Sequence, residues 1–154
     1  MLNFFNKMFA VVEDNNKPQI DQTKKNQIAT CALFLEIANA DDDFADDEKE
    51  LIIKVMKTIF NLSDTEVTEL MSLSEKQIED SVSLYEFTDI INKNFSSDEK
   101  YEILLNLWRL IFVDEKFHQY EDYLIRKIVN NLNLTHKDMI AAKMSVKKEL
   151  KGQA

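Results

Sequence analysis

Four acidic residues are the part of this 154-residue chain best suited to chemistry. Asp41 precedes Glu48 by seven residues, and Asp114 precedes Glu121 by the same spacing. Each glutamate stands three and four residues before the first apolar residues of a helical stripe, so its side chain should face inward with that stripe. Carboxylate oxygens suit a hard cation such as Ca²⁺, Mg²⁺ or Mn²⁺ better than they suit zinc. We therefore predict that these four carboxylates bind a divalent cation.

The same glutamates have a second interpretation as helix caps. Glu48 follows Ala45, and Glu121 follows His118, by three residues, which is the spacing of a capping box. Alanine and histidine are poor N-caps, so such boxes would be half built. The surrounding segment 41–50, with seven acids and one lysine, is also typical of a solvated helix start, because the helix dipole favours acids there.

Other metal sites and catalytic constellations do not fit the sequence. Counted from Asp41, the sixth residue is Asp46 where an EF-hand needs glycine, and the twelfth is Ile52 where it needs glutamate. One Glu-x-x-His, from Glu115 to His118, lacks the second copy that a ferritin-like di-iron site requires. No serine or cysteine has a histidine placed as its base. We expect neither an enzyme nor an organic cofactor.

Composition limits the fold, the partners and the location. One glycine and one proline in the whole chain exclude glycine-rich phosphate loops and most β-rich architectures, which leaves an all-helical protein. The net charge of −9 repels the phosphates of nucleic acid. No apolar run is long enough to span a membrane. Cys31, the single cysteine, is expected to be a small buried hydrophobe and fits a reducing compartment. We expect a cytoplasmic protein, either free or at the inner face of the membrane.

The fold class predicted from the periodicity is an all-α bundle of about seven helices. A hydroxyl three positions before an acid predicts helix starts at Ser63, Ser96 and Thr135, and Ser83 is a further candidate N-cap. The expected helices are 22–39, 46–60, 64–80, 84–94, 97–112, 119–132 and 136–149.

Two of these helices, 22–39 and 97–112, are apolar on nearly all sides and should lie in the middle of the bundle. Trp108 is therefore expected in the core. The apolar part of each helix contains one charged residue, Glu36 in the first and Arg109 in the second. Because a buried charge is costly unless it is paired, we predict that Glu36 and Arg109 form an ion pair. The alternative is that both side chains reach solvent separately.

The sequence repeats itself at a shift of 73 residues. Residues 41–48 then lie over residues 114–121, with Asp, Phe and Glu matching at the first, fourth and eighth positions. Apolar matches continue along the helices that follow. We infer two copies of a helix–loop–helix–helix unit, residues 28–71 and 101–143, joined by the segment 72–95.

The single folded domain is expected over residues 20–150, preceded by an amphipathic helix and linker over residues 1–19. Large apolar residues recur at helical spacing near the start: Leu2, Phe5, Met8, Phe9 and Val12. This helix either docks on its own subunit or a neighbouring one in a homo-oligomer, or anchors the protein to a partner or, through residues 1–12, to a membrane surface.

Several stretches together resemble one known family. They include the repeated Asp-x-x-Phe-x-x-x-Glu motif and the segments 32–41, 84–92, 107–110, 113–114, 120–121, 124–128 and 141–143. Over about residues 28–145 the chain resembles the TerB-like proteins of the bacterial tellurite-resistance family. The family usually has glycine after each motif aspartate, and here those places hold Asp42 and Glu115.

The resemblance implies an all-helical, duplicated protein that is cytoplasmic or membrane-associated and linked to tellurite resistance and stress responses. It also implies that the acidic motifs, here Asp41, Glu48, Asp114 and Glu121, bind metal ions. Our leading hypothesis is a non-enzymatic helical module that responds to a divalent cation and acts with protein partners. The competing hypothesis is a helical interaction scaffold in which Glu48 and Glu121 only cap helices.

Overall fold

Seven helices make up the described part of the chain in a computed structural model, which describes residues 22–40, 46–81, 83–113 and 119–152. They are α2 (Gln22–Ala38), α3 (Asp46–Phe60), α4 (Asp64–Asp80), α5 (Tyr85–Asn94), α6 (Ser97–Val113), α7 (Gln119–Asn131) and α8 (His136–Gly152). These residues contain no strand. The all-α prediction is confirmed, and the observed bounds lie close to the expected ones.

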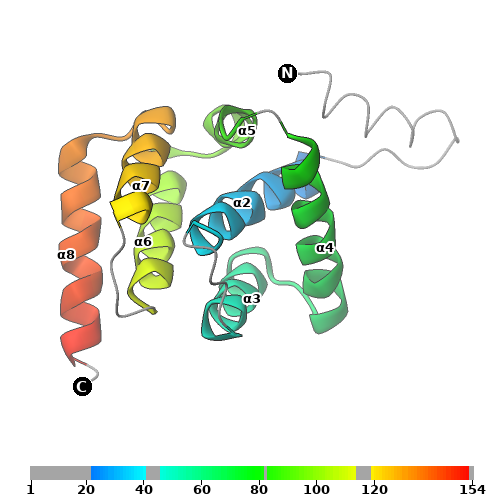
Figure 1. The fold of residues 1–154 in the computed structure, drawn as a ribbon, viewed down its shortest axis with the longest axis horizontal. Coiled ribbons are helices and arrows are strands. Elements are labelled where there is room, and N and C mark those ends of the chain that lie inside the picture. Colours follow the sequence, from blue (N-terminus) through cyan, green and yellow to red (C-terminus); the bar gives the residue numbers. More distant parts are fainter. Residues whose placement is uncertain (1–21, 41–45, 82, 114–118, 153–154) are drawn as a thin grey trace, which may run out of the picture.

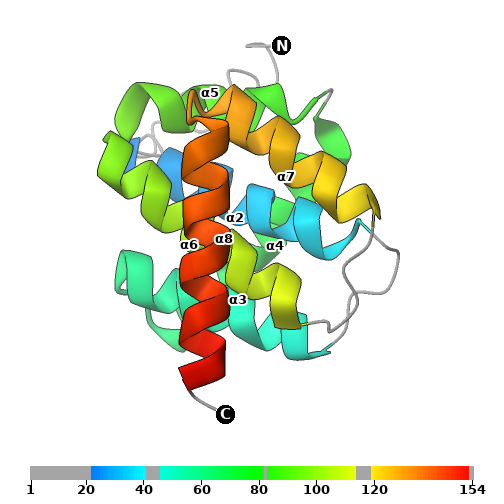
Figure 2. The same cartoon turned by 90° about the vertical axis from the view of Figure 1, so that its left-hand side faces the viewer.

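Helix α2 runs through the middle of the bundle (Figure 1). It packs mainly against α4 and α5, whereas α6 packs mainly against α8. Helices α4 and α8 lie at opposite ends of the longest axis, and the quarter turn of Figure 2 brings α8 to the front of the molecule. The two expected units correspond to α2–α3–α4 and α6–α7–α8. Whether the two units superpose stays a prediction.

The core is formed along almost the whole length of α2 and α6. From Gln27 to Ala38 every α2 residue except Glu36 is buried. In α6 the side chain of Trp108 is 1% exposed, and its indole N–H donates to the Met139 carbonyl at 3.2 Å. The ring stacks on Phe112 with centroids 5.6 Å apart, and the Lys143 ammonium lies 5.3 Å from its centroid. The predicted central position of both helices and of Trp108 is confirmed.

Three helix starts are the capping boxes that the sequence predicts. In each box the side chain of the first residue accepts from the backbone of the fourth, and the acid of the fourth accepts in return. The pairs are Ser63 with Glu66, Ser96 with Glu99, and Thr135 with Asp138. The fourth candidate, Ser83, is wrong: α5 begins at Tyr85, and its N-cap, Leu84, makes no side-chain capping bond.

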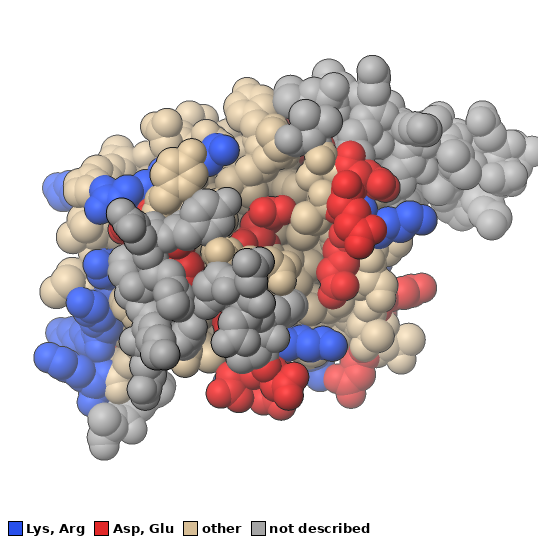
Figure 3. Space-filling view, viewed as in Figure 1, with Lys and Arg blue, Asp and Glu red and all other residues tan. Residues whose placement is uncertain are grey.

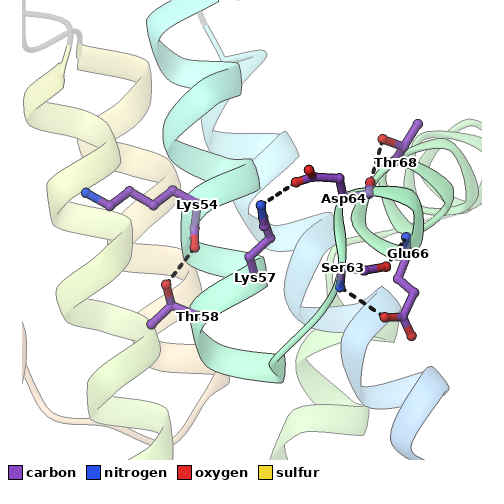
Figure 4. A network of polar contacts seen from close by, with 7 residues as sticks. All are labelled: Lys54, Lys57, Thr58, Ser63, Asp64, Glu66 and Thr68. Atoms are coloured by element: carbon purple, nitrogen blue, oxygen red, sulfur yellow. Dashed lines mark hydrogen bonds and ion pairs between the residues drawn. The ribbon is translucent and has the colours of Figure 1, made fainter.

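The junction between α3 and α4 shows how such a start is fixed (Figure 4). The Ser63 backbone N–H donates to the Glu66 carboxylate at 2.9 Å, which holds the pKa of Glu66 below its usual range. Lys57 at the end of α3 forms an ion pair with Asp64 at the start of α4, and this bond lowers the pKa of Asp64. The two helices are therefore joined by polar contacts across a short connection.

Helices α3 and α7 end in the same kind of turn. Asn61 and Asn133 have left-handed backbone, with φ of 55° and 60°. The N–H of Leu62 donates to the Lys57 carbonyl at 3.2 Å, and that of Leu134 donates to the Val129 carbonyl at 3.0 Å. This is the Schellman arrangement, in which asparagine is the usual substitute for glycine. It allows a chain with one glycine to stop these helices sharply, at equivalent places in the two proposed units.

Replacing Asn61 or Asn133 with alanine is expected to lower the free energy of unfolding by about 1 kcal/mol each. Alanine has a Cβ atom, which disfavours left-handed backbone, and it lacks the polar side chain with which asparagine can form a local hydrogen bond. Glycine at the same positions should cost less than alanine. Urea unfolding of the four single variants measures this. Equal effects of alanine and glycine would contradict the role given to the backbone conformation.

Candidate metal centre

Glu48 and Glu121 are both buried, although both are charged residue types. Glu48 is the third residue of α3 and Glu121 the third residue of α7, and each is 2% exposed. Both helices turn an apolar face to the core, with Ile52 four residues after Glu48 and Ile125 four residues after Glu121. The prediction that the two glutamates face inward with these stripes is confirmed.

The helix ends that carry these glutamates gather on one side of the molecule. In Figures 1 and 2 the C-terminal ends of α2 and α6 lie near the N-terminal ends of α3 and α7. This side is at the right of Figure 2. The fold thus brings the starts of α3 and α7 to a common region, although 73 residues separate them along the chain.

The other two predicted ligands, Asp41 and Asp114, lie outside the described residues. Within the described residues, no group of three or more His, Cys, Asp or Glu side chains is arranged to hold a metal ion. The predicted centre therefore depends on Asp41 and Asp114 joining the two buried glutamates. Carboxylates of this kind fit a hard, oxygen-bound cation.

Glu48 and Glu121 differ in solvent exposure from the acids that cap other helices. Glu66 and Glu99 occupy the same third position in α4 and α6, and both are exposed while they complete their capping boxes. Capping therefore does not require burial of the acid in this fold. Glu48 and Glu121 are therefore placed differently from the capping acids of α4 and α6.

The predicted ion pair between Glu36 and Arg109 is wrong. Arg109 Nε and an Nη atom donate to the two carboxylate oxygens of Glu149 in α8, each at 2.8 Å, and its other Nη donates to Asn106 at 2.7 Å. The side chains of Arg109 and Glu149 are 29% and 38% exposed. Arg109 lies on the side of α6 that packs against α8, so the nearest acid comes from α8.

Glu36 is half-buried without Arg109 beside it. Burial raises the pKa of Glu36, and the charge of Lys127 on α7 opposes this with a smaller effect. A raised pKa means that folding favours the protonated carboxyl. The stabilisation from this preference is present below the pKa of the unfolded chain and is lost as the pH rises through the raised value.

Replacing Glu36 with glutamine is therefore expected to raise the melting temperature at about pH 7.5 and to change it little at about pH 4, where the carboxyl is largely protonated. Melting of wild type and Glu36→Gln at the two pH values checks this. Glu79→Gln, at an exposed position of α4, is the matched control. An equal shift at both pH values would show that the charge of Glu36 is not responsible.

Two further groups bear on the chemistry of the molecule. Burial raises the pKa of the Cys31 thiol to about 12, so this cysteine is a core residue and not a nucleophile, as expected.

Glu86, 3% exposed in α5, is a buried acid that the sequence patterns did not lead us to expect. The signal was there, since Glu86 stands four residues before Ile90 as Glu48 stands before Ile52.

Surface charge is divided between the two ends of the molecule. Acidic side chains gather over α3 and α4, and basic side chains gather at the end formed by α8 (Figure 3). The exposed lysines of α8 are Lys137, Lys147, Lys148 and Lys151. The exposed acids of α4 are Asp64, Glu66, Glu69, Glu75, Glu79 and Asp80. A partner protein would meet opposite charges at the two ends.

Comparison with known proteins identifies one family. The sequence model of the family described as Tellurite resistance protein TerB matches residues 27–144, from the first turns of α2 into α8. No curated protein and no solved structure matches the chain. None of the described helices is both long and apolar enough to cross a membrane.

Proposed function

The chain belongs to the TerB family of tellurite resistance proteins, and from that premise we propose that it is a cytoplasmic module that binds a divalent cation and responds to this binding. The module acts by binding and not by catalysis, together with protein partners of a tellurite-resistance or stress-response system. Residues Asp41, Glu48, Asp114 and Glu121 hold the cation, with Ca²⁺, Mg²⁺ and Mn²⁺ as the candidates.

The burial of Glu48 and Glu121 at the same position of two equivalent helices is the observation that supports this proposal. Removing a carboxylate from water is costly unless nearby positive charge or hydrogen bonds compensate. A helix N-terminus supplies a partial positive charge to each glutamate. A cation shared with the neighbouring aspartates would add further positive charge, and its departure would leave acids repelling one another near four helix ends.

Two described groups that could act as nucleophile or base support the non-catalytic part of the proposal. Cys31 is buried with a raised pKa, and His136 lies exposed in the first turn of α8. The other histidine, His118, lies outside the described residues. Neither described group is placed to activate a substrate.

Binding of Mn²⁺ to the full chain tests the proposal. Equilibrium dialysis of wild type against Mn²⁺ should show saturable binding, and competition should rank Ca²⁺ and Mg²⁺ against it. Asp41→Asn with Asp114→Asn, and Glu48→Gln with Glu121→Gln, should each weaken binding at least tenfold. Asp47→Asn with Glu50→Gln also removes two charges from this region, but at exposed positions, and should bind like wild type.

The scaffold is the second candidate function, and the division of charge between α4 and α8 favours it. On this alternative the acidic and basic ends recruit partners, and Glu48 and Glu121 serve only to cap α3 and α7. Absence of saturable Mn²⁺ binding, or equal binding by all variants, would support the scaffold and reject the cation site.

A further inference from the structure

A groove of about 410 Å³ lies at the end of the molecule where α2 begins. Its walls come from the start of α2, the end of α3, the end of α5 and the first half of α6. The apolar part of the lining is Ile59, Phe60, Phe95 and Ile103. Three of these side chains are half-buried, packed against the core on one side and open on the other. The groove is large enough for several apolar side chains.

The chain enters the folded bundle at the edge of this groove. The first described residue is Gln22, and Thr23 belongs to the groove lining. Before it come an apolar segment, residues 2–12, a polar linker, residues 13–19, and Ile20 and Asp21. The nine residues between the segment and Gln22 reach about 30 Å when extended, which is enough for the segment to return to the groove. Pro18 in the linker prevents the segment from continuing as part of α2.

The segment and the groove complement each other in polarity and charge. Five large apolar residues of the segment recur at three- and four-residue intervals, on one side of a helix. A helix of this length is marginal in water unless its apolar face is packed. Lys7 is the only charged residue among residues 1–12, whereas the charged residues of the groove are Glu99 and Glu102. Attachment through the short linker gives a millimolar effective concentration, so that modest affinity suffices.

We propose that residues 2–12 form an amphipathic helix that binds in this groove of the same chain and covers it. The proposal is independent of the cation site, since it uses the opposite ends of α2, α3 and α6. It assigns the N-terminal segment to its own subunit and not to a membrane or to a second copy.

Intrachain disulfide formation tests the proposal directly. Met8→Cys places a thiol on the apolar stripe, and Asn94→Cys places one at an exposed position of the groove lining. Native Cys31 does not compete, because it is buried and its pKa is raised to about 12. With oxidised glutathione as the oxidant, this pair should form a monomeric disulfide-linked species. It should do so at least tenfold faster than the control pair Met8→Cys with Lys148→Cys on α8.

A second set of variants tests the stripe itself. Adding Phe5→Ser and Phe9→Ser to the Met8→Cys, Asn94→Cys chain should abolish the rate advantage, and the bundle should keep its helical circular dichroism because these changes lie outside it. Equal rates for the two cysteine pairs would overturn the proposal. Disulfide-linked dimers would assign the segment to a second copy. Binding to vesicles with 30% anionic phospholipid, with no intrachain disulfide in their absence, would assign it to a membrane surface.

Discussion

Replacing Trp108 with alanine is expected to lower the free energy of unfolding by about 3–5 kcal/mol and the melting temperature by about 6–20 °C. The indole is 1% exposed in the middle of α6, where it stacks on Phe112 and lies beneath the Lys143 ammonium. Alanine would leave a large cavity between α6 and α8 and would remove the donor to the Met139 carbonyl. Chemical denaturation followed by circular dichroism measures the loss.

Two control variants separate the contributions of Trp108. Trp108→Phe keeps an aromatic ring but loses the indole N–H, so it should cost about 1 kcal/mol for the hydrogen bond plus a smaller packing loss. Tyr85→Ala removes an aromatic side chain from an exposed position of α5 and should change stability by about 0.5 kcal/mol or less. Similar costs for Trp108→Ala and Tyr85→Ala would contradict the central place of α6 in the core.

The helices could be predicted because their signals are local. The capping boxes at Ser63, Ser96 and Thr135 each depend on two residues three positions apart, and the structure contains all three. Ser83 has a hydroxyl in a similar context, yet the chain places Leu84 at the N-cap of α5. Ser83 also has an acid, Glu86, at the fourth position, so this pattern indicates that a helix starts nearby but does not alone decide which residue becomes the N-cap.

The inward position of Glu48 and Glu121 could also be predicted, because it follows from the apolar residues three and four positions later on the same helix. The partner of Arg109 could not. The repeat placed Glu36 opposite Arg109 by pseudo-symmetry, but the acid that binds Arg109 is Glu149, forty residues later on α8. Which side of α6 meets α8 depends on tertiary packing, and no local pattern encodes it.

The second large effect expected is stabilisation of the fold by a divalent cation. A ligand that binds only the folded state adds about 2.7 kcal/mol when it is present at 100 times its dissociation constant. In a domain of this size that is about 5–10 °C in melting temperature. The effect is expected because the cation would relieve repulsion among Asp41, Glu48, Asp114 and Glu121. Ionic strength must be held constant, since screening alone stabilises a protein with a net charge of −9.

Glutamine is the informative replacement for the two buried glutamates. It keeps their size and can still return a capping hydrogen bond, but it carries no charge to bind a cation. The variant Glu48→Gln with Glu121→Gln should therefore fold and should lose the cation response. The variant Asp47→Asn with Glu50→Gln removes two exposed acids near the same helix start. It should retain the response.

The melting temperatures of wild type and these two variants, with and without Mn²⁺ at constant ionic strength, test the cation site most directly. We predict a shift of about 5–10 °C for wild type and for Asp47→Asn with Glu50→Gln, and a shift near zero for Glu48→Gln with Glu121→Gln. Equal shifts in all three proteins, or no shift in wild type, would contradict the cation site and leave Glu48 and Glu121 as helix caps.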